Sequence, residues 1–135
     1  MDERIAVTLP WMRKAITDLQ SAKKLSSGPD PIFDAAVYHC QQSAEKAVKG
    51  FLVFHSHPFK KIHDVEVLAN DAAVYDNRFA QWYEIAAKLT PYGIQFRYPS
   101  ETEPEAYECE EIIKNTESFI EFIFSILPPS VRPAL

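Results

Sequence analysis

Glycine and cysteine are both scarce in this sequence, and each scarcity narrows the folds and sites it can form. Only 3 of the 135 residues are glycine, so no glycine-rich phosphate-binding loop is present, and long uninterrupted elements are favoured. The two cysteines, Cys40 and Cys109, are far apart and fit no zinc-binding spacing. We therefore expect both to be reduced packing residues of a cytoplasmic protein.

The sequence also lacks an excess of basic residues and any long apolar run. Lysine and arginine number 14 against 19 aspartates and glutamates, and the resulting net charge of −5 argues against a broad surface for duplex DNA or RNA. A small local basic pocket is compatible with this balance. No stretch approaches the roughly 18 apolar residues of a membrane span, and residues 1–10 lack the apolar core of a signal peptide. We expect no contact with a membrane.

Apolar periodicity predicts helices between the prolines. Hydrophobic residues make up 47% of the chain, enough to build a core for one domain spanning residues 1–135. The spacing predicts four long helices, over about residues 10–25, 31–55, 78–89 and 104–127, and a short one over about residues 64–72. No strand pattern competes with these helices. The expected fold is therefore all-α, an antiparallel up-and-down bundle of four long helices plus one short helix.

The polar face of the second expected helix is the first candidate binding site. It carries four residues spaced +3, +4 and +3, which places them on one side of a helix: His39, Gln42, Lys46 and Lys49. A histidine and two lysines in a row can hold an anionic group such as phosphate. The alternative is a solvated helix face on which Glu45 pairs with Lys49.

Two loops carry further candidate residues. In the basic loop at residues 60–64, Asp64 can cap the short helix and His63 can hydrogen-bond across the loop. Arg97 and Tyr98 lie in a segment expected to be irregular, and loop residues on a rigid scaffold often bind ligands. The structural alternative is an arginine that ties down its loop through carbonyl contacts. We expect no metal and no cofactor, because nothing fixes the geometry of the histidines as ligands.

Three segments together resemble the HEPN domain family, which consists of small helical bundles. They are residues 38–49, Lys61-Ile62-His63-Asp64 and Phe96-Arg97-Tyr98-Pro99, and Trp11 with Ala15, Asp18 and Leu19 also looks like the opening helix of the family. The resemblance covers about residues 8–127. Many HEPN proteins are encoded beside a minimal nucleotidyltransferase and form a toxin–antitoxin pair with it. Some are metal-independent ribonucleases with an R-x4–6-H motif at a dimer interface, and others bind nucleotides or nucleic acid without catalysis.

The ribonuclease motif of that family is absent, since no histidine follows an arginine by five to seven positions. We therefore expect a non-catalytic subunit that binds a nucleotide or an RNA phosphate and acts with a separate minimal nucleotidyltransferase. The expected ligand-binding residues are His39, Gln42, Lys46, Lys49, His63, Arg97 and Tyr98. The alternative is a metal-independent ribonuclease toxin with a rearranged site. In it, His63 or His39 is the general acid or base and Arg97 stabilises the developing charge.

The last expected helix predicts a homodimer. Its apolar residues spread over an arc of about 200°, whereas a helix at the edge of a bundle needs little more than about 100° to face its core. The excess, centred on Phe119, Phe122 and Ile126, would be covered by a second copy. HEPN domains commonly pair, so the resemblance points the same way. The alternative is that residues 94–99 and the C-terminal tail bury this arc within one chain.

Overall fold

The computed structural model of this chain describes residues 2–59, 61–95 and 103–133, and every regular element in them is helical. This confirms the all-α prediction. The elements are α1 (Glu3–Leu25), α2 (Phe33–Phe54), α3 (Val65–Ala72), the 3₁₀ helix η1 (Asn77–Trp82), α4 (Tyr83–Leu89), α5 (Tyr92–Gln95), α6 (Ala106–Ser125) and the 3₁₀ helix η2 (Pro129–Val131). None of the helices in these ranges is long and apolar enough to cross a membrane.

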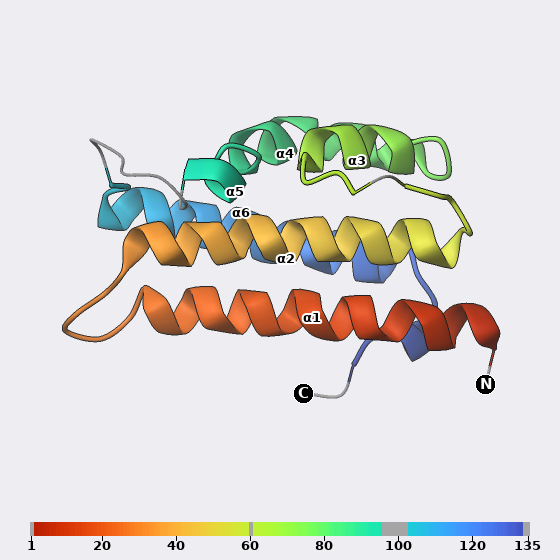
Figure 1. Cartoon of the computed structure of the whole chain (residues 1–135), viewed down its shortest axis with the longest axis horizontal. Helices are drawn as coiled ribbons and strands as arrows, with labels where there is room; N and C mark the ends of the chain where they lie inside the picture. Colours follow the sequence, from red (N-terminus) through yellow and green to blue (C-terminus); the bar gives the residue numbers. More distant parts are fainter. Residues whose placement is uncertain (1, 60, 96–102, 134–135) are drawn as a thin grey trace.

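Helix α2 lies at the centre of the arrangement. Figure 1 shows α1 running antiparallel to α2 on one side, α3, α4 and α5 forming a layer on the other side, and α6 lying behind α2. Accordingly, α2 contacts α1, α3, α4, α5 and α6. Its fourth side, between α1 and the α3–α5 layer, is left uncovered by any helix (Figure 1).

Helix α1 begins at Glu3, seven residues earlier than expected, with Pro10 inside it. Proline suits the first turn of a helix, where its missing N–H has no partner to lose, and this is why we expected the helix to start near Pro10. Three features stabilise the additional turns. The side chain of Asp2 accepts a hydrogen bond from the backbone N–H of Arg4 at 2.8 Å, while Thr8 is buried and Ile5 packs against the core.

The long helix expected over residues 78–89 is two shorter elements, η1 and α4, so three helices of 20 or more residues accompany several short ones. Asp76 caps η1 by accepting a hydrogen bond from the N–H of Arg78 at 3.0 Å. The short helix α3 begins as expected, because the Asp64 side chain accepts from the N–H of Val67 at 3.1 Å. Residues 94 and 95, expected to be irregular, complete α5.

The core forms where α1, α2, α3, η1, α4 and α6 meet. Its largest fully buried apolar side chains are Met12, Phe51, Leu52, Leu68, Phe79, Leu89, Phe119, Ile120 and Ile123. Both cysteines are free and buried, as expected. Burial raises the pKa of Cys40 to about 12, so its thiol stays protonated and acts as a packing group.

The wide apolar arc of α6 is largely covered within the chain. Phe119 is fully buried, which corrects its expected place in an exposed patch. Phe122 is half-buried, and its ring stacks on Trp82 of η1 with the centroids 5.3 Å apart. Val131 of η2 is also buried. The covering elements are therefore η1 and η2.

Candidate functional site

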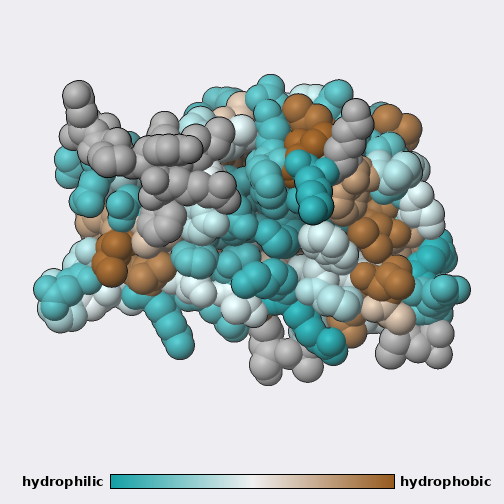
Figure 2. Space-filling view, in the orientation of Figure 1, coloured by the Kyte–Doolittle hydropathy of each residue, from teal (hydrophilic) through white to brown (hydrophobic). Residues whose placement is uncertain are grey.

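The uncovered side of α2 is the candidate functional site. Figure 2 views the molecule from this side, and hydrophilic residues occupy much of the middle of the face, with apolar patches toward its ends. Helix α2 contributes the half-buried side chains of Tyr38, His39, Gln42 and Lys46.

A buried carboxylate, Glu45, organises the middle of this site. Its side chain is only 1% exposed. Its Oε1 accepts a hydrogen bond from Gln41 Nε2 at 3.2 Å and lies 3.2 Å from His63 Nδ1. Its Oε2 lies 3.2 Å from Lys49 Nζ and 3.4 Å from Lys46 Nζ. One carboxylate therefore holds two ammonium groups and an imidazole together.

Two opposing effects act on the pKa of Glu45. Burial alone raises it, because the charged form loses hydration. The charges of Lys46 and Lys49, with the hydrogen bonds from Gln41 and Lys49, outweigh burial and hold the pKa below its ordinary value of 4.5. Glu45 is therefore an anion at neutral pH.

A chain of amide hydrogen bonds fixes the side chains around Glu45. Gln41 Oε1 accepts from Gln42 Nε2 at 2.7 Å, and Gln42 Oε1 in turn accepts from Lys46 Nζ at 2.9 Å. Gln41 Nε2 also donates to the carbonyl of His63 at 3.0 Å, which pins the loop before α3 onto α2. A Cβ at Gly93 of α5 would lie 2.7 Å from the Gln41 side chain, so only glycine lets α5 approach this closely.

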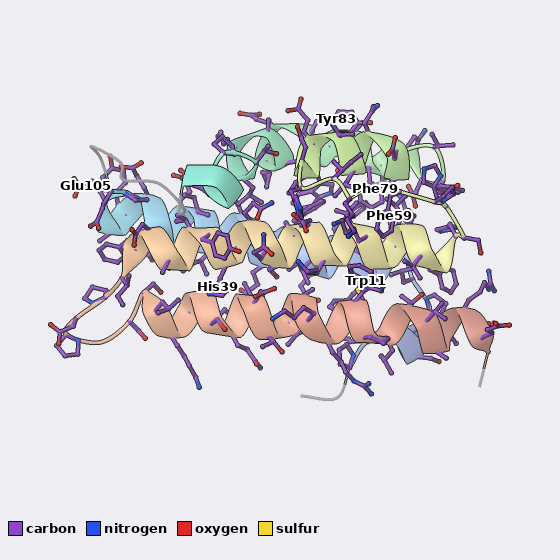
Figure 3. All side chains as sticks on the ribbon, in the orientation of Figure 1. Trp11, His39, Phe59, Phe79, Tyr83 and Glu105 are labelled. Carbon is purple, nitrogen blue, oxygen red and sulfur yellow. The ribbon has the colours of Figure 1, made fainter. Side chains whose placement is uncertain are left out.

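The cationic groups differ in how far a ligand can reach them. The Lys49 side chain is 7% exposed, and its Nζ lies 5.5 Å from the centroid of the Phe59 ring. Phe59 packs edge-on against Trp11 of α1 at this end of the site (Figure 3). The Lys46 side chain is 19% exposed and that of His63 is 64% exposed. Lys46 and His63 can therefore contact a ligand, whereas Lys49 supports Glu45 from within.

His39 lies apart from this network, at the edge of α2 that faces α1 (Figure 3). Its Nδ1 lies 3.0 Å from Oδ1 of Asp18, a buried residue of α1. The predicted row of four residues thus divides: Gln42, Lys46 and Lys49 join the Glu45 network with His63, while His39 pairs with α1. Arg97 and Tyr98 lie outside the residues that the structure describes, so their convergence on this site stays a prediction.

Three residues of the site were missed by sequence reasoning as site residues: Gln41, Glu45 and Asp18. The spacing of Gln41 and Glu45 did carry a signal. Gln41, Glu45 and Lys49 follow one another at intervals of four residues and therefore share one side of a helix. Asp18 was recognised only as part of the opening helix. Within the described ranges, no group of three or more histidines, cysteines or carboxylates could hold a metal ion.

Comparisons with known proteins agree with this architecture. A family model for the HEPN domain matches residues 9–127. The crystal structure of an archaeal HEPN homologue is similar, with a TM-score of 0.68 and 25% sequence identity, and the match covers 87% of this chain and 95% of that one. The comparison with curated proteins gives no match. Because the family match spans most of the sequence and the fold agrees with it, this protein belongs to the HEPN domain family.

Proposed function

We propose that this HEPN-domain protein is a non-catalytic subunit that binds the phosphate of a nucleotide or an RNA strand over the Glu45 network. The observation that carries the proposal is the position of Lys46 and His63 around one buried carboxylate. Glu45 and the glutamine chain fix Lys46 before a ligand arrives, so little side-chain entropy is lost on binding.

The charge of the network suits a single phosphate group. Two lysines and one glutamate leave a net charge of +1 when His63 is neutral, and protonation of His63 raises it to +2. A phosphate oxygen can accept from Lys46 Nζ. It can also accept from His63 Nε2 when the ring is protonated, because Nδ1 faces Glu45 and carries the only hydrogen of the neutral ring. Arg97 would add a further cation if its loop turns toward α2.

The direct experiment is a titration of the protein with ATP, with GTP and with a short single-stranded RNA, each measured by isothermal titration calorimetry. We expect saturable binding by at least one of them that weakens as salt increases, because phosphate recognition depends on charge. If none binds at millimolar concentration, the phosphate-binding proposal is wrong.

The ribonuclease alternative has one structural observation in its favour. His63 Nδ1 faces the buried carboxylate of Glu45, and this arrangement orients an imidazole in many catalytic sites. The RNA from the titration therefore needs to be checked for cleavage on a gel. Intact RNA supports the binding subunit. Cleavage that disappears in both Arg97→Ala and His63→Ala would favour the ribonuclease.

The proposed protein partner is a separate minimal nucleotidyltransferase, as in a toxin–antitoxin pair. This proposal rests on the family, many members of which are paired with such an enzyme. Co-expression with a minimal nucleotidyltransferase from the same genome, followed by size-exclusion chromatography, tests it. Co-elution of the two chains supports the pair, and separate elution contradicts it.

A homodimer remains part of the proposal, although Phe119 does not contribute to its surface. Phe122 and Ile126 are half-buried and stay available for a contact between copies. Light scattering at micromolar concentration should give about twice the mass of one 15.4 kDa chain. A mass near 15.4 kDa would reject the dimer.

A further inference from the structure

The Asp18–His39 pair is a polar site that phosphate binding does not use. Asp18 is 3% exposed, and its Oδ2 is a buried atom without a hydrogen-bond partner among the described residues. Its Oδ1 lies 3.0 Å from His39 Nδ1 and 3.8 Å from the ammonium of Lys14. A buried carboxylate oxygen without a partner is a costly arrangement for a contact that only joins two helices, since an apolar pair could join them without that penalty.

The pairing determines what His39 offers to a ligand. A carboxylate oxygen only accepts hydrogen bonds, so Nδ1 of His39 carries the hydrogen. In the neutral ring, Nε2 is then an acceptor with a free lone pair. The His39 side chain is 30% exposed, and it precedes Lys46 by seven residues, about two helical turns, so both residues lie on one side of α2. His39 therefore presents a hydrogen-bond acceptor to this face, where Lys46 presents donors.

Chemistry decides which part of a nucleotide fits such an acceptor. Phosphate oxygens are themselves acceptors and do not pair with a neutral Nε2, whereas a ribose hydroxyl can donate to it. His39 precedes Lys46 by seven residues, which places it about 10 Å away along the helix axis. A ligand with its phosphate at Lys46 therefore needs to extend along α2 to bring a sugar to His39.

We propose that His39, positioned by Asp18, accepts a hydrogen bond from a ribose 2′-hydroxyl and so selects ribonucleotide ligands over deoxyribonucleotide ligands. This inference rests on the proposed phosphate site, since the ligand has to be held at Lys46 for its sugar to reach His39. The 2′-hydroxyl is the group that distinguishes RNA from DNA. Asp18 acts through His39 and is a positioning residue.

The experiment compares three pentanucleotides of uridine that differ only at the 2′ position: hydroxyl, hydrogen and O-methyl. We expect the hydroxyl form to bind about three- to tenfold more tightly than the other two, the range that one hydrogen bond gives. The O-methyl form keeps the oxygen but cannot donate, so it should bind like the deoxy form. Equal affinity for all three would overturn the inference and leave phosphate binding intact. ATP and dATP, titrated in parallel, show whether the ribose preference extends from an RNA strand to a free nucleotide.

Two substitutions of His39 separate its two nitrogens. His39→Asn keeps an amide N–H near the position of Nδ1, so it can still pair with Asp18, but it offers nothing at the position of Nε2. We expect this variant to bind the hydroxyl form as weakly as the deoxy form, with affinity for the deoxy form unchanged. His57→Asn, in the segment that follows α2, is the matched control and should keep the preference. A preference that survives His39→Asn would contradict the role of His39.

The role of Asp18 needs a readout that helix packing alone does not change. Nitrogen-15 NMR of the imidazole at pH 8 should show His39 with its hydrogen on Nδ1, and Asp18→Asn should populate the other tautomer and reduce the ribose preference. A wild-type ring with its hydrogen on Nε2 would overturn the inference. Failure of the wild type to bind any pentanucleotide or nucleotide would instead reject the phosphate site and the inference with it.

Discussion

Replacing Glu45 with alanine should lower the free energy of unfolding by about 3–5 kcal/mol, the cost of breaking a buried ion pair from one side. Lys49 is 7% exposed and would lose its carboxylate partner in the interior. Gln41 would lose one acceptor, and His63 would lose the group that faces its Nδ1. Urea denaturation followed by circular dichroism measures the effect.

The matched control is Glu84→Ala on α4. Glu84 also pairs with a lysine four residues later, Lys88, but its side chain is 83% exposed. Solvent screens such a pair, so this substitution should cost no more than about 0.5 kcal/mol. Comparable losses in the two variants would show that the burial of Glu45 is unimportant.

The difference in stability between the wild type and Glu45→Ala should also depend on pH. The pKa of Glu45 lies below 4.5 in the folded chain, so its contribution to stability is complete above that value. The contribution is lost as the pH falls through the folded-state pKa, where the carboxylate becomes protonated. The difference in stability between the wild type and Glu45→Ala should therefore be largest near neutral pH and shrink below about pH 4.5. A difference that grows in acid would contradict the assignment.

Reversing two charges, Lys46→Glu with Arg97→Glu, should weaken phosphate binding by about 100-fold or more. Lys46→Glu replaces attraction by repulsion at close range, and we propose that Arg97→Glu does the same. The fold should survive with reduced stability, since Lys46 lies outside the apolar core but the new carboxylate lies beside Glu45. Calorimetry with the tightest ligand measures the loss. Undiminished affinity would refute the site.

The control for that experiment reverses two charges elsewhere, Lys88→Glu with Lys114→Glu. Both lysines pair only with exposed glutamates in the described structure, and the change in net charge is the same. Lys88 also lines a groove between α4 and α6 with Tyr92, Glu108 and Glu111. If the control variant loses binding while Lys46→Glu with Arg97→Glu keeps it, the ligand occupies this groove instead.

The sequence was sufficient to predict the features that depend on local pattern. The polar face of α2 and the Asp64 cap of α3 follow from helical spacing and capping chemistry, and both are present. The start of α1 and the division between η1 and α4 were wrong because packing decides them. Ile5 and Thr8 stabilise turns that Pro10 alone would disfavour.

The candidate site also depends on packing that a local sequence pattern does not predict. A helical projection groups His39 with Lys46, but it ignores the two turns between them along the axis, and Asp18 of α1 is the actual partner of His39. The projection also places Glu45 on a polar face without revealing that the loop before α3 and Gly93 of α5 close over its surroundings. Burial of a carboxylate depends on these distant segments, so no local pattern predicts it.

The most direct measurement of the central claim is a map of amide chemical shifts in nitrogen-15-labelled protein during titration with the short RNA or nucleotide that binds. A phosphate held over the Glu45 network should shift the resonances of Gln42, Lys46 and His63 most, with saturation at the affinity given by calorimetry. Shifts concentrated at Tyr92, Glu108 and Glu111, with Lys46 and His63 unchanged, would contradict the claim.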